Sequence, residues 1–148
     1  TIYRNFATKD DLLRGILEEV LRQFDEVRDR ALALDDPVEA VSTFVREMYH
    51  VLDRWSPVAM AMLSGAFTDE VKEHFLDFLR DRRLEAVFKR GIDEGVFRAD
   101  LPIELARGML INTCDPLIYL AVQDIMTHEQ MAAGYTDMIL RAIRAPAT

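Results

Sequence analysis

Apolar residues recur every three or four positions along almost the whole chain, and no stretch alternates apolar and polar positions for long. This spacing predicts an all-α, multi-helix bundle of five long helices and one short segment. The first long helix is expected over about 9–33, because Thr8 can cap it and Asp11 follows three positions later. At about 1.5 Å per residue, such a helix would extend for roughly 40 Å.

The second helix and the short segment have clear boundaries in the sequence. Asp36 is expected to cap the second helix and Pro37 to open it, and the pair Ser56-Pro57 should end it. The segment 58–67 is almost wholly apolar, and its lack of a polar face implies burial on most sides.

The second half of the chain predicts three more long helices. One is expected to start after Thr68 and to continue to about residue 94. The next is expected over about 102–123, with a kink at Pro116. The last should open at Thr127, where Gln130 completes a capping box.

Composition and charge narrow the class of protein. The 148 residues are 50% hydrophobic and 30% charged, which is typical of one globular domain, and no apolar run is long enough to span a membrane. We therefore expect a cytoplasmic protein. The net charge of −8 would repel phosphate, so any contact with DNA must be local. The single cysteine, Cys114, is expected to be a small buried residue.

The sequence offers little that indicates catalysis or metal binding. His50, His74 and His128 lie on three different predicted helices, and none has a partner at metal-ligand spacing. For His74 the simplest interpretation is a surface charge pair with Glu70 and Asp77. Phosphate-binding loops and nucleophile motifs are absent from the sequence. We expect a protein that is not an enzyme and needs neither a metal nor a cofactor.

The opening residues carry a specific resemblance. They run Thr-Ile-Tyr-Arg-Asn-Phe-Ala-Thr-Lys-Asp-Asp-Leu-Leu. This string is similar to one in the TetR (tetracycline-repressor-like) family, Thr-aliphatic-Tyr-x-polar-aromatic-x-Ser/Thr-Lys-acid-x-Leu-Leu. In that family it ends the recognition helix of the helix-turn-helix, forms the exit turn and starts the helix that leads to the regulatory domain.

The resemblance implies a division of the chain. Residues 1–7 would be a remnant of the helix-turn-helix, most of which is expected to be missing upstream, and residues 8–148 would form a ligand-binding and dimerisation domain. A hydroxyl and a lysine beside exposed main-chain N–H groups suit phosphate contacts rather than base reading. The residues to which the resemblance assigns phosphate contacts are Thr1, Tyr3, Asn5 and Lys9.

The resemblance also implies an effector cavity, because the family's regulatory domain resembles a helical bundle around an apolar pocket. Methionine and aromatic residues alone would indicate a packed core more often than a pocket. Three polar residues on apolar faces would orient an effector, or would instead form an internal ion pair and satisfy carbonyls freed at Pro116. The expected wall comprises Phe44, Met48, Trp55, Met60, Phe67 and Phe78, and the polar residues are Arg82, Asn112 and Asp115.

The last two predicted helices carry more apolar surface than one packing face each requires, which normally marks an interface. The resemblance implies an isologous four-helix bundle between two copies of the chain. Periodicity alone does not decide which stripe faces the partner. The candidate interface residues are Leu110, Leu117, Met131, Tyr135, Met138 and Ile139.

Together these features predict a transcriptional regulator, a repressor, that binds operator DNA as a homodimer. A small, largely apolar effector would select one orientation of the first long helix and thereby change the affinity for DNA. The alternative is a non-catalytic helical dimerisation or interaction module with a fully packed core and no effector pocket.

Overall fold

The computed structural model of the protein describes residues 7–57, 68–113 and 115–147. These residues are mostly helical, and the only β-type pairing among them is an isolated bridge between Phe97 and Arg144. The predicted all-α class is therefore confirmed. The helices are α1 (Lys9–Leu32), α2 (Pro37–Arg54), α4 (Asp69–Arg80), α5 (Glu85–Asp93), α6 (Ile103–Asn112), α7 (Pro116–Val122) and α8 (His128–Ile143).

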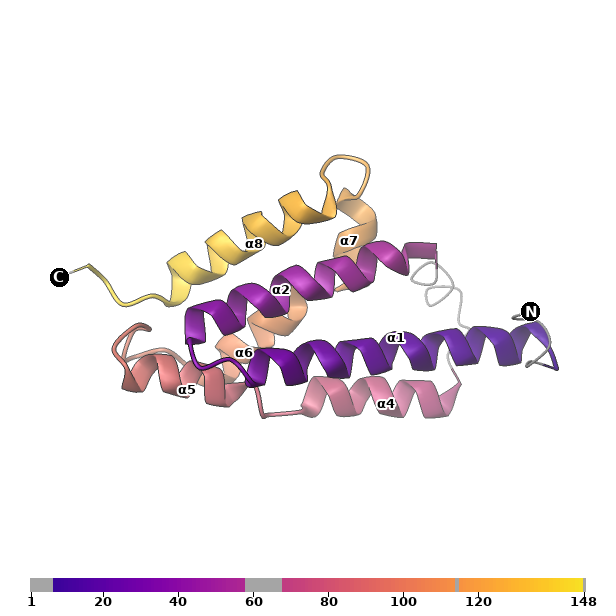
Figure 1. The fold of residues 1–148 in the computed structure, drawn as a ribbon, viewed down its shortest axis with the longest axis horizontal. Coiled ribbons are helices and arrows are strands. Elements are labelled where there is room, and N and C mark those ends of the chain that lie inside the picture. Colours follow the sequence, from indigo (N-terminus) through magenta and orange to yellow (C-terminus); the bar gives the residue numbers. More distant parts are fainter. Residues whose placement is uncertain (1–6, 58–67, 114, 148) are drawn as a thin grey trace.

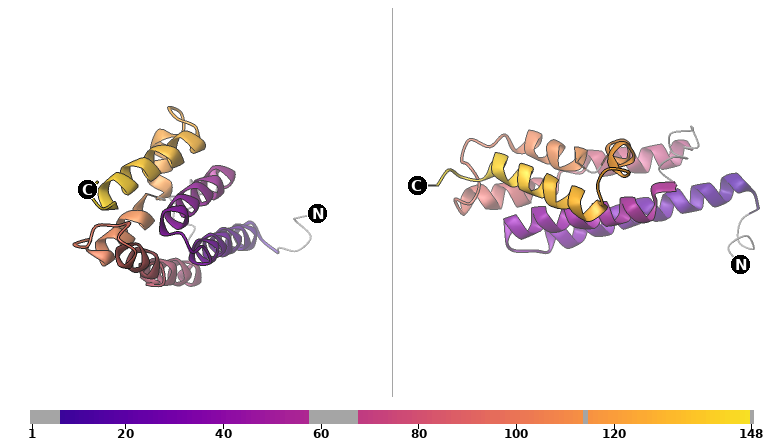
Figure 2. Two further views of the ribbon diagram at one scale, coloured as in Figure 1. Left: turned by 60° about the vertical axis from the view of Figure 1, so that its left-hand side comes forward. Right: turned by 90° about the horizontal axis from the view of Figure 1, so that it is seen from above.

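The helix α2 is the centre of the bundle (Figure 1). It packs against α1 on one side and α8 on the other, and it also contacts α5 and α7. The helix α4 covers a further side of α1, and α6 packs on α5 and touches α8. Figure 2 shows the same arrangement from two further directions. The consequence is that α1 and α8 lie on opposite flanks of α2.

Local capping chemistry sets where four of the helices begin. The Thr8 hydroxyl accepts a hydrogen bond at the start of α1, the Asp36 carboxylate does so at the start of α2, and the Thr68 hydroxyl does so at α4. At α8, Thr127 and Gln130 form the complete capping box. Each of these beginnings was predicted from the sequence and is confirmed.

The helix predicted from Thr68 to about residue 94 is in fact two helices, α4 and α5. The backbone turns to an extended conformation at Asp81, whose carboxylate accepts a hydrogen bond from the Arg83 backbone N–H at 2.9 Å. An aspartate bound in this way competes with the helical ladder. Arg107 of α6 donates to the carbonyls of Leu79 and Asp81, at 2.8 and 3.3 Å, which satisfies acceptors that the break releases.

The helix predicted over 102–123 is also two helices, α6 and α7, rather than one kinked helix. Pro116 occupies the first turn of α7, and Asp115 is its N-cap with an extended backbone. The Asp115 carboxylate accepts from the Leu117 backbone N–H at 2.8 Å. Because proline disfavours a helical conformation in the preceding residue and aspartate is a strong N-cap, the chain restarts a helix here.

An aromatic cluster joins α2 to the C-terminal helices. The Tyr49 side chain is fully buried, and its hydroxyl donates to the carbonyl of Thr113. Its ring stacks on Tyr135 of α8 with a centroid distance of 5.7 Å, and it meets Tyr119 of α7 at 6.4 Å. Such ring pairs stabilise beyond their buried area. The cluster therefore ties α7 and α8 to the central helix.

Among the described helices, none is both long enough and apolar enough to cross a membrane.

Candidate functional site

The N-terminal end of α1 projects beyond the other helices. The helix is continuous over 24 residues, and its first turns extend past the ends of α2 and α4 (Figure 1). Lys9 lies at this end and is exposed, so its ammonium group is accessible to a phosphate. The other residues assigned phosphate contacts, Thr1, Tyr3 and Asn5, lie outside the described residues.

The C-terminal half of α1 is fastened to the junction between α4 and α5. The Arg28 side chain is only 7% exposed, and its Nη1 atom lies 2.8 Å from Asp25 Oδ1 and 3.1 Å from Asp81 Oδ2. Its Nε atom lies 3.2 Å from Asp29 Oδ1, and its guanidinium sits over the Phe78 ring. Loss of Arg28 would leave the carboxylates of this cluster without this buried cation, which is costly. The cluster therefore holds α1 against the junction between α4 and α5.

Asp81 belongs to this cluster through a second arginine. The Arg83 guanidinium hydrogen-bonds the Asp81 carboxylate with contacts down to 2.7 Å, and this is the largest cause that lowers the pKa of Asp81. Burial raises that pKa and the positive charge of Arg28 lowers it further. The carboxylate is thus held in its charged form by two cations from different parts of the fold.

His74 also faces α1. Its Nε2 atom lies 2.9 Å from Asp25 Oδ2, across the α1–α4 contact. The expectation that His74 pairs with Glu70 and Asp77 on its own helix is therefore wrong, because the side chain turns toward a carboxylate that is 49 positions away in sequence. The contact adds a polar link between α1 and α4.

The predicted apolar wall is divided between the core and the surface. Phe44, Met48 and Phe78 are buried and pack into the core of the bundle. Trp55 is half-buried, and its indole N–H donates to the Gln23 side-chain oxygen at 3.1 Å. The remaining two members of the predicted wall, Met60 and Phe67, lie outside the described residues, as does Cys114.

Two of the predicted polar residues have structural partners. Arg82 is exposed and lies 2.9 Å from Glu85 and 3.7 Å from Glu104. The expectation that it lies on the apolar side of a helix is wrong, because the α4–α5 break removes the helical register. Asp115 caps α7, and Asn112 is exposed at the end of α6. The expected internal ion pair of Arg82 is instead a surface pair, and the Asp115 carboxylate accepts from the Leu117 N–H rather than satisfying a carbonyl freed at Pro116.

Other apolar side chains of the same helices keep exposed area. Phe75 and Leu79 on α4, Met109 on α6 and Trp55, the C-cap residue of α2, pack against the core but are only partly buried. A ligand that covered such side chains would gain burial without opening the core. Helical spacing puts Phe75 and Leu79 on the apolar stripe of α4, but such spacing does not separate a half-buried position from a fully buried one.

The predicted interface residues differ in exposure. Leu117 and Met138 are 51% and 57% exposed, and Tyr135 is half-buried. Leu105 of α6, which the sequence analysis did not select, is 72% exposed. These exposed side chains come from the three C-terminal helices. The other three candidates, Leu110, Met131 and Ile139, are buried within this chain.

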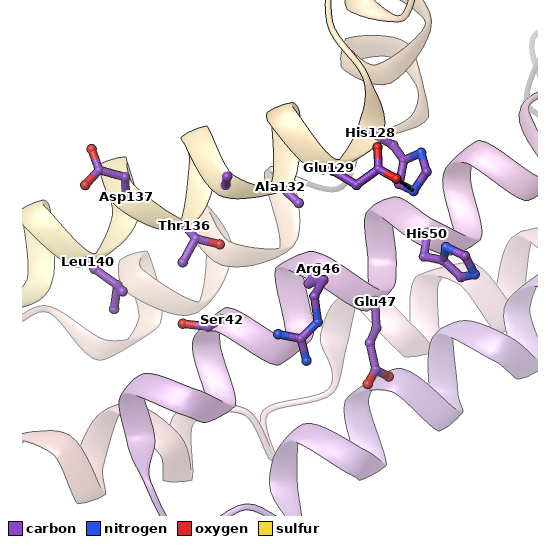
Figure 3. Close-up of a pocket in the computed structure, with 11 residues that line it drawn as sticks. Ser42, Arg46, Glu47, His50, His128, Glu129, Ala132, Thr136, Asp137 and Leu140 are labelled. Atoms are coloured by element: carbon purple, nitrogen blue, oxygen red, sulfur yellow. Dashed lines mark ion pairs between the residues drawn. The ribbon is translucent and has the colours of Figure 1, made fainter.

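A groove runs between α2 and α8, with a volume of about 750 Å³ (Figure 3). None of its residues belongs to the predicted effector wall. Arg46 lies on the α2 side, and Thr136 and Leu140 extend from α8 toward α2. The lining comprises Ser42, Arg46, Glu47, His50, His128, Glu129, Ala132, Ala133, Thr136, Asp137 and Leu140.

A polar cluster closes one end of this groove. His128 Nδ1 lies 3.3 Å from Asp53 Oδ2, and the Tyr119 hydroxyl donates to Asp53 Oδ1 at 2.7 Å. Burial, with a further contribution from Asp53, raises the pKa of Tyr119 to about 12. The ring of His50 lies 5.7 Å from that of His128. In the described part of the chain, no group of three or more potential ligands is arranged to hold a metal.

No family model matches the chain. Two curated proteins are similar to it over nearly its whole length. It is 24% identical over 161 residues to the HTH-type transcriptional repressor KstR2 of Rhodococcus jostii, covering 99% of this chain and 75% of that protein. It is 22% identical over 154 residues to the uncharacterized HTH-type transcriptional regulator YfiR of Bacillus subtilis, covering 95% and 75%.

Two solved structures of transcriptional regulators are also similar to the chain. The TetR family transcriptional regulator PfmR from Thermus thermophilus superposes with a TM-score of 0.77 and 28% identity, covering 94% of this chain and 79% of that one. The ketosteroid transcriptional regulator KstR2 of Mycobacterium tuberculosis gives a TM-score of 0.61 at 20% identity, covering 97% and 77%. The chain therefore has a TetR-like fold. All four proteins are named as regulators or repressors and none as an enzyme, which supports a role in transcriptional regulation.

Proposed function

We propose that the chain is the ligand-binding and dimerisation part of a transcriptional repressor whose affinity for operator DNA depends on a small effector. The observation that carries the proposal is α1, an unbroken helix with an exposed end at Lys9 and a buried attachment at Arg28. By the resemblance of residues 1–13, the bases would be read by a helix-turn-helix that precedes Thr1, in a dimer with one recognition helix per half-site.

The proposed effector is small and largely apolar, and it binds between α2, α4 and α6. The partly buried side chains of Trp55, Phe75, Leu79 and Met109 support this location, because an apolar ligand gains burial there. Phe44, Met48 and Phe78 would contribute from the core sides of the same helices, and Met60 and Phe67 from the sequence between them. Asn112, which is exposed at the end of α6, remains a candidate polar contact.

The proposed dimer forms through the three C-terminal helices. Leu117 and Met138 support it, because a helical dimer interface needs large apolar side chains that are accessible to the partner, and these two are more than half exposed. Leu105 extends the same proposal to α6. The buried candidates Leu110, Met131 and Ile139 would act by shaping α6 and α8 rather than by direct contact.

The effector can act only if its affinities for the DNA-binding and the released conformations differ, with a coupling of typically about 1–3 kcal/mol. The test is an operator gel shift with the full-length protein, with and without small apolar compounds that raise its melting temperature. Trp55→Ala should abolish both stabilisation and release. Lys9→Gln should weaken DNA binding and leave stabilisation by the compound unchanged.

The competing function is a helical dimerisation module without an effector, which the complete burial of Phe44 and Met48 favours. The same experiments separate the two. If no apolar compound raises the melting temperature, the module is supported. If compounds stabilise the protein but the operator affinity stays unchanged at saturation, the regulatory half of the proposal is refuted.

A further inference from the structure

The α2–α8 groove contains three carboxylates, and two of them are paired with an arginine. Glu47 lies 2.6 Å from Arg30 of α1, and Asp137 lies 2.8 Å from Arg141 on its own helix. Glu129 lies 3.2 Å from His128. An ion-paired carboxylate repels an anion less than a free one does. Two of the three acidic residues of the lining, Glu47 and Asp137, are therefore largely neutralised by an arginine.

Arg46 is the groove's only arginine or lysine, and among the described residues no carboxylate pairs with it. The contact recorded for its guanidinium is a hydrogen bond to the Thr43 hydroxyl at 3.2 Å. Arg46 is exposed, and its guanidinium carries five N–H donors. Figure 3 shows the Arg46 side chain leaving α2 between Ser42 and His50, midway along the length of the groove.

The α8 side of the groove offers both polar and apolar side chains. Ala132, Ala133 and Leu140 line it, and the Thr136 side chain extends between them toward α2. A volume of about 750 Å³ lies within the range of small-molecule sites, which is roughly 300–1,000 Å³. Such sites combine an apolar lining with a few polar groups that fix orientation.

We propose that the α2–α8 groove is a second ligand site, which binds a small amphipathic anion. The acidic group pairs with the Arg46 guanidinium, whose planar fork matches a carboxylate, sulfonate or phosphate. The Thr136 hydroxyl can donate a further hydrogen bond to it. The apolar body of the ligand lies along Ala132, Ala133 and Leu140.

The charge of the groove selects this occupant over two others. An amphipathic cation would place its charge next to the unpaired Arg46. A helix from a second copy of the chain would bury that guanidinium without a carboxylate partner, which is costly. The site shares no residue with the proposed effector wall, so the inference does not depend on where the effector binds.

The test uses two fluorescent probes with the same apolar body. 8-Anilinonaphthalene-1-sulfonate carries an anionic group, and N-phenyl-1-naphthylamine lacks it. The variants are Arg46→Gln and Arg54→Gln; Arg54 lies on the same helix, lines the neighbouring α1–α2 groove and has no carboxylate partner among the described residues. Both variants remove one exposed charge, so their net charge is matched. Circular dichroism confirms that each variant is folded.

Arg46→Gln should weaken sulfonate binding about tenfold, as expected for the loss of a charge-assisted hydrogen bond, and Arg54→Gln should not. Binding of the neutral probe should be unchanged in both. Ala133→Trp, which fills the groove, should weaken both probes. Equal sulfonate affinity in Arg46→Gln and the parent would overturn the proposal. Sulfonate binding that falls as the protein dimerises would also overturn it, and would assign the groove to a second copy.

Discussion

Replacing Arg28 by methionine tests whether the buried cluster holds α1 in place. The substitution keeps the apolar stem beside Phe78 and removes the guanidinium, whose Nη1 atom lies 2.8 Å from Asp25 and 3.1 Å from Asp81. Breaking a buried ion pair costs about 3–5 kcal/mol when the remaining charge is left uncompensated. Here Asp81 keeps Arg83 as a partner. We therefore expect the free energy of unfolding to fall by about 2–3 kcal/mol.

The assay is urea unfolding followed by circular dichroism, supported by thermal melts. A loss of this size should lower the melting temperature by roughly 5–10 °C for a domain of this length. Arg22→Met is the matched control on the same helix, because Arg22 is exposed and, among the described residues, forms ion pairs with Glu19 and Glu26 of α1 alone. It should leave the free energy of unfolding nearly unchanged, because exposed ion pairs contribute little to stability. Equal losses in the two variants would refute the reasoning.

Three further predictions follow from exposure, packing and charge. Leu117→Asp and Met138→Asp should each weaken dimerisation, measured by sedimentation velocity, without lowering the melting temperature, because both side chains are more than half exposed. Gly91→Ala should lower the free energy of unfolding by about 1–3 kcal/mol, although alanine is the better helix former, because the new Cβ would lie 2.1 Å from the buried Phe97 ring. Adding Phe97→Leu should relieve this loss, as measured by urea unfolding. Burial raises the pKa of Tyr119 from 10.0 to about 12, so the contribution of the neutral Tyr119 to stability should be complete below pH 10 and should decline as the pH rises toward 12. Tyr119→Phe should abolish that decline in melting temperatures measured across this pH range.

The sequence predicted those parts of the fold that depend on neighbouring residues. The beginnings of α1, α2 and α8 follow from Thr8, Asp36 and Thr127, whose side chains satisfy backbone groups within the next three positions. The break at Asp81 was missed although it is also local. The Asp81 carboxylate binds the backbone N–H two positions further on, which is a known way for aspartate to interrupt a helix. This signal was missed because the apolar periodicity continues across the break.

The candidate sites were less predictable because they depend on contacts between distant segments. Asp25 with His74, and Asp53 with His128, are pairs that no periodicity links. Helical spacing placed Phe44 on an apolar stripe, but the burial of its side chain is set by the other helices that pack against α2. The α2–α8 groove was missed for the same reason. It forms between two helices that are far apart in the sequence.

The attachment of α1 has a geometric consequence for regulation. Lys9 and Arg28 are separated by 19 positions, which correspond to about 29 Å along a helix. A tilt of about 5° around Arg28 would therefore move the Lys9 end by roughly 2.5 Å, which is close to the length of a hydrogen bond. Since Arg28 contacts Asp81 directly after α4, a ligand that shifts α4 acts at the pivot of this helix. Under the proposed function, a small rearrangement beside Phe75 and Leu79 would then be sufficient to displace the Lys9 end of the helix, without any break in α1.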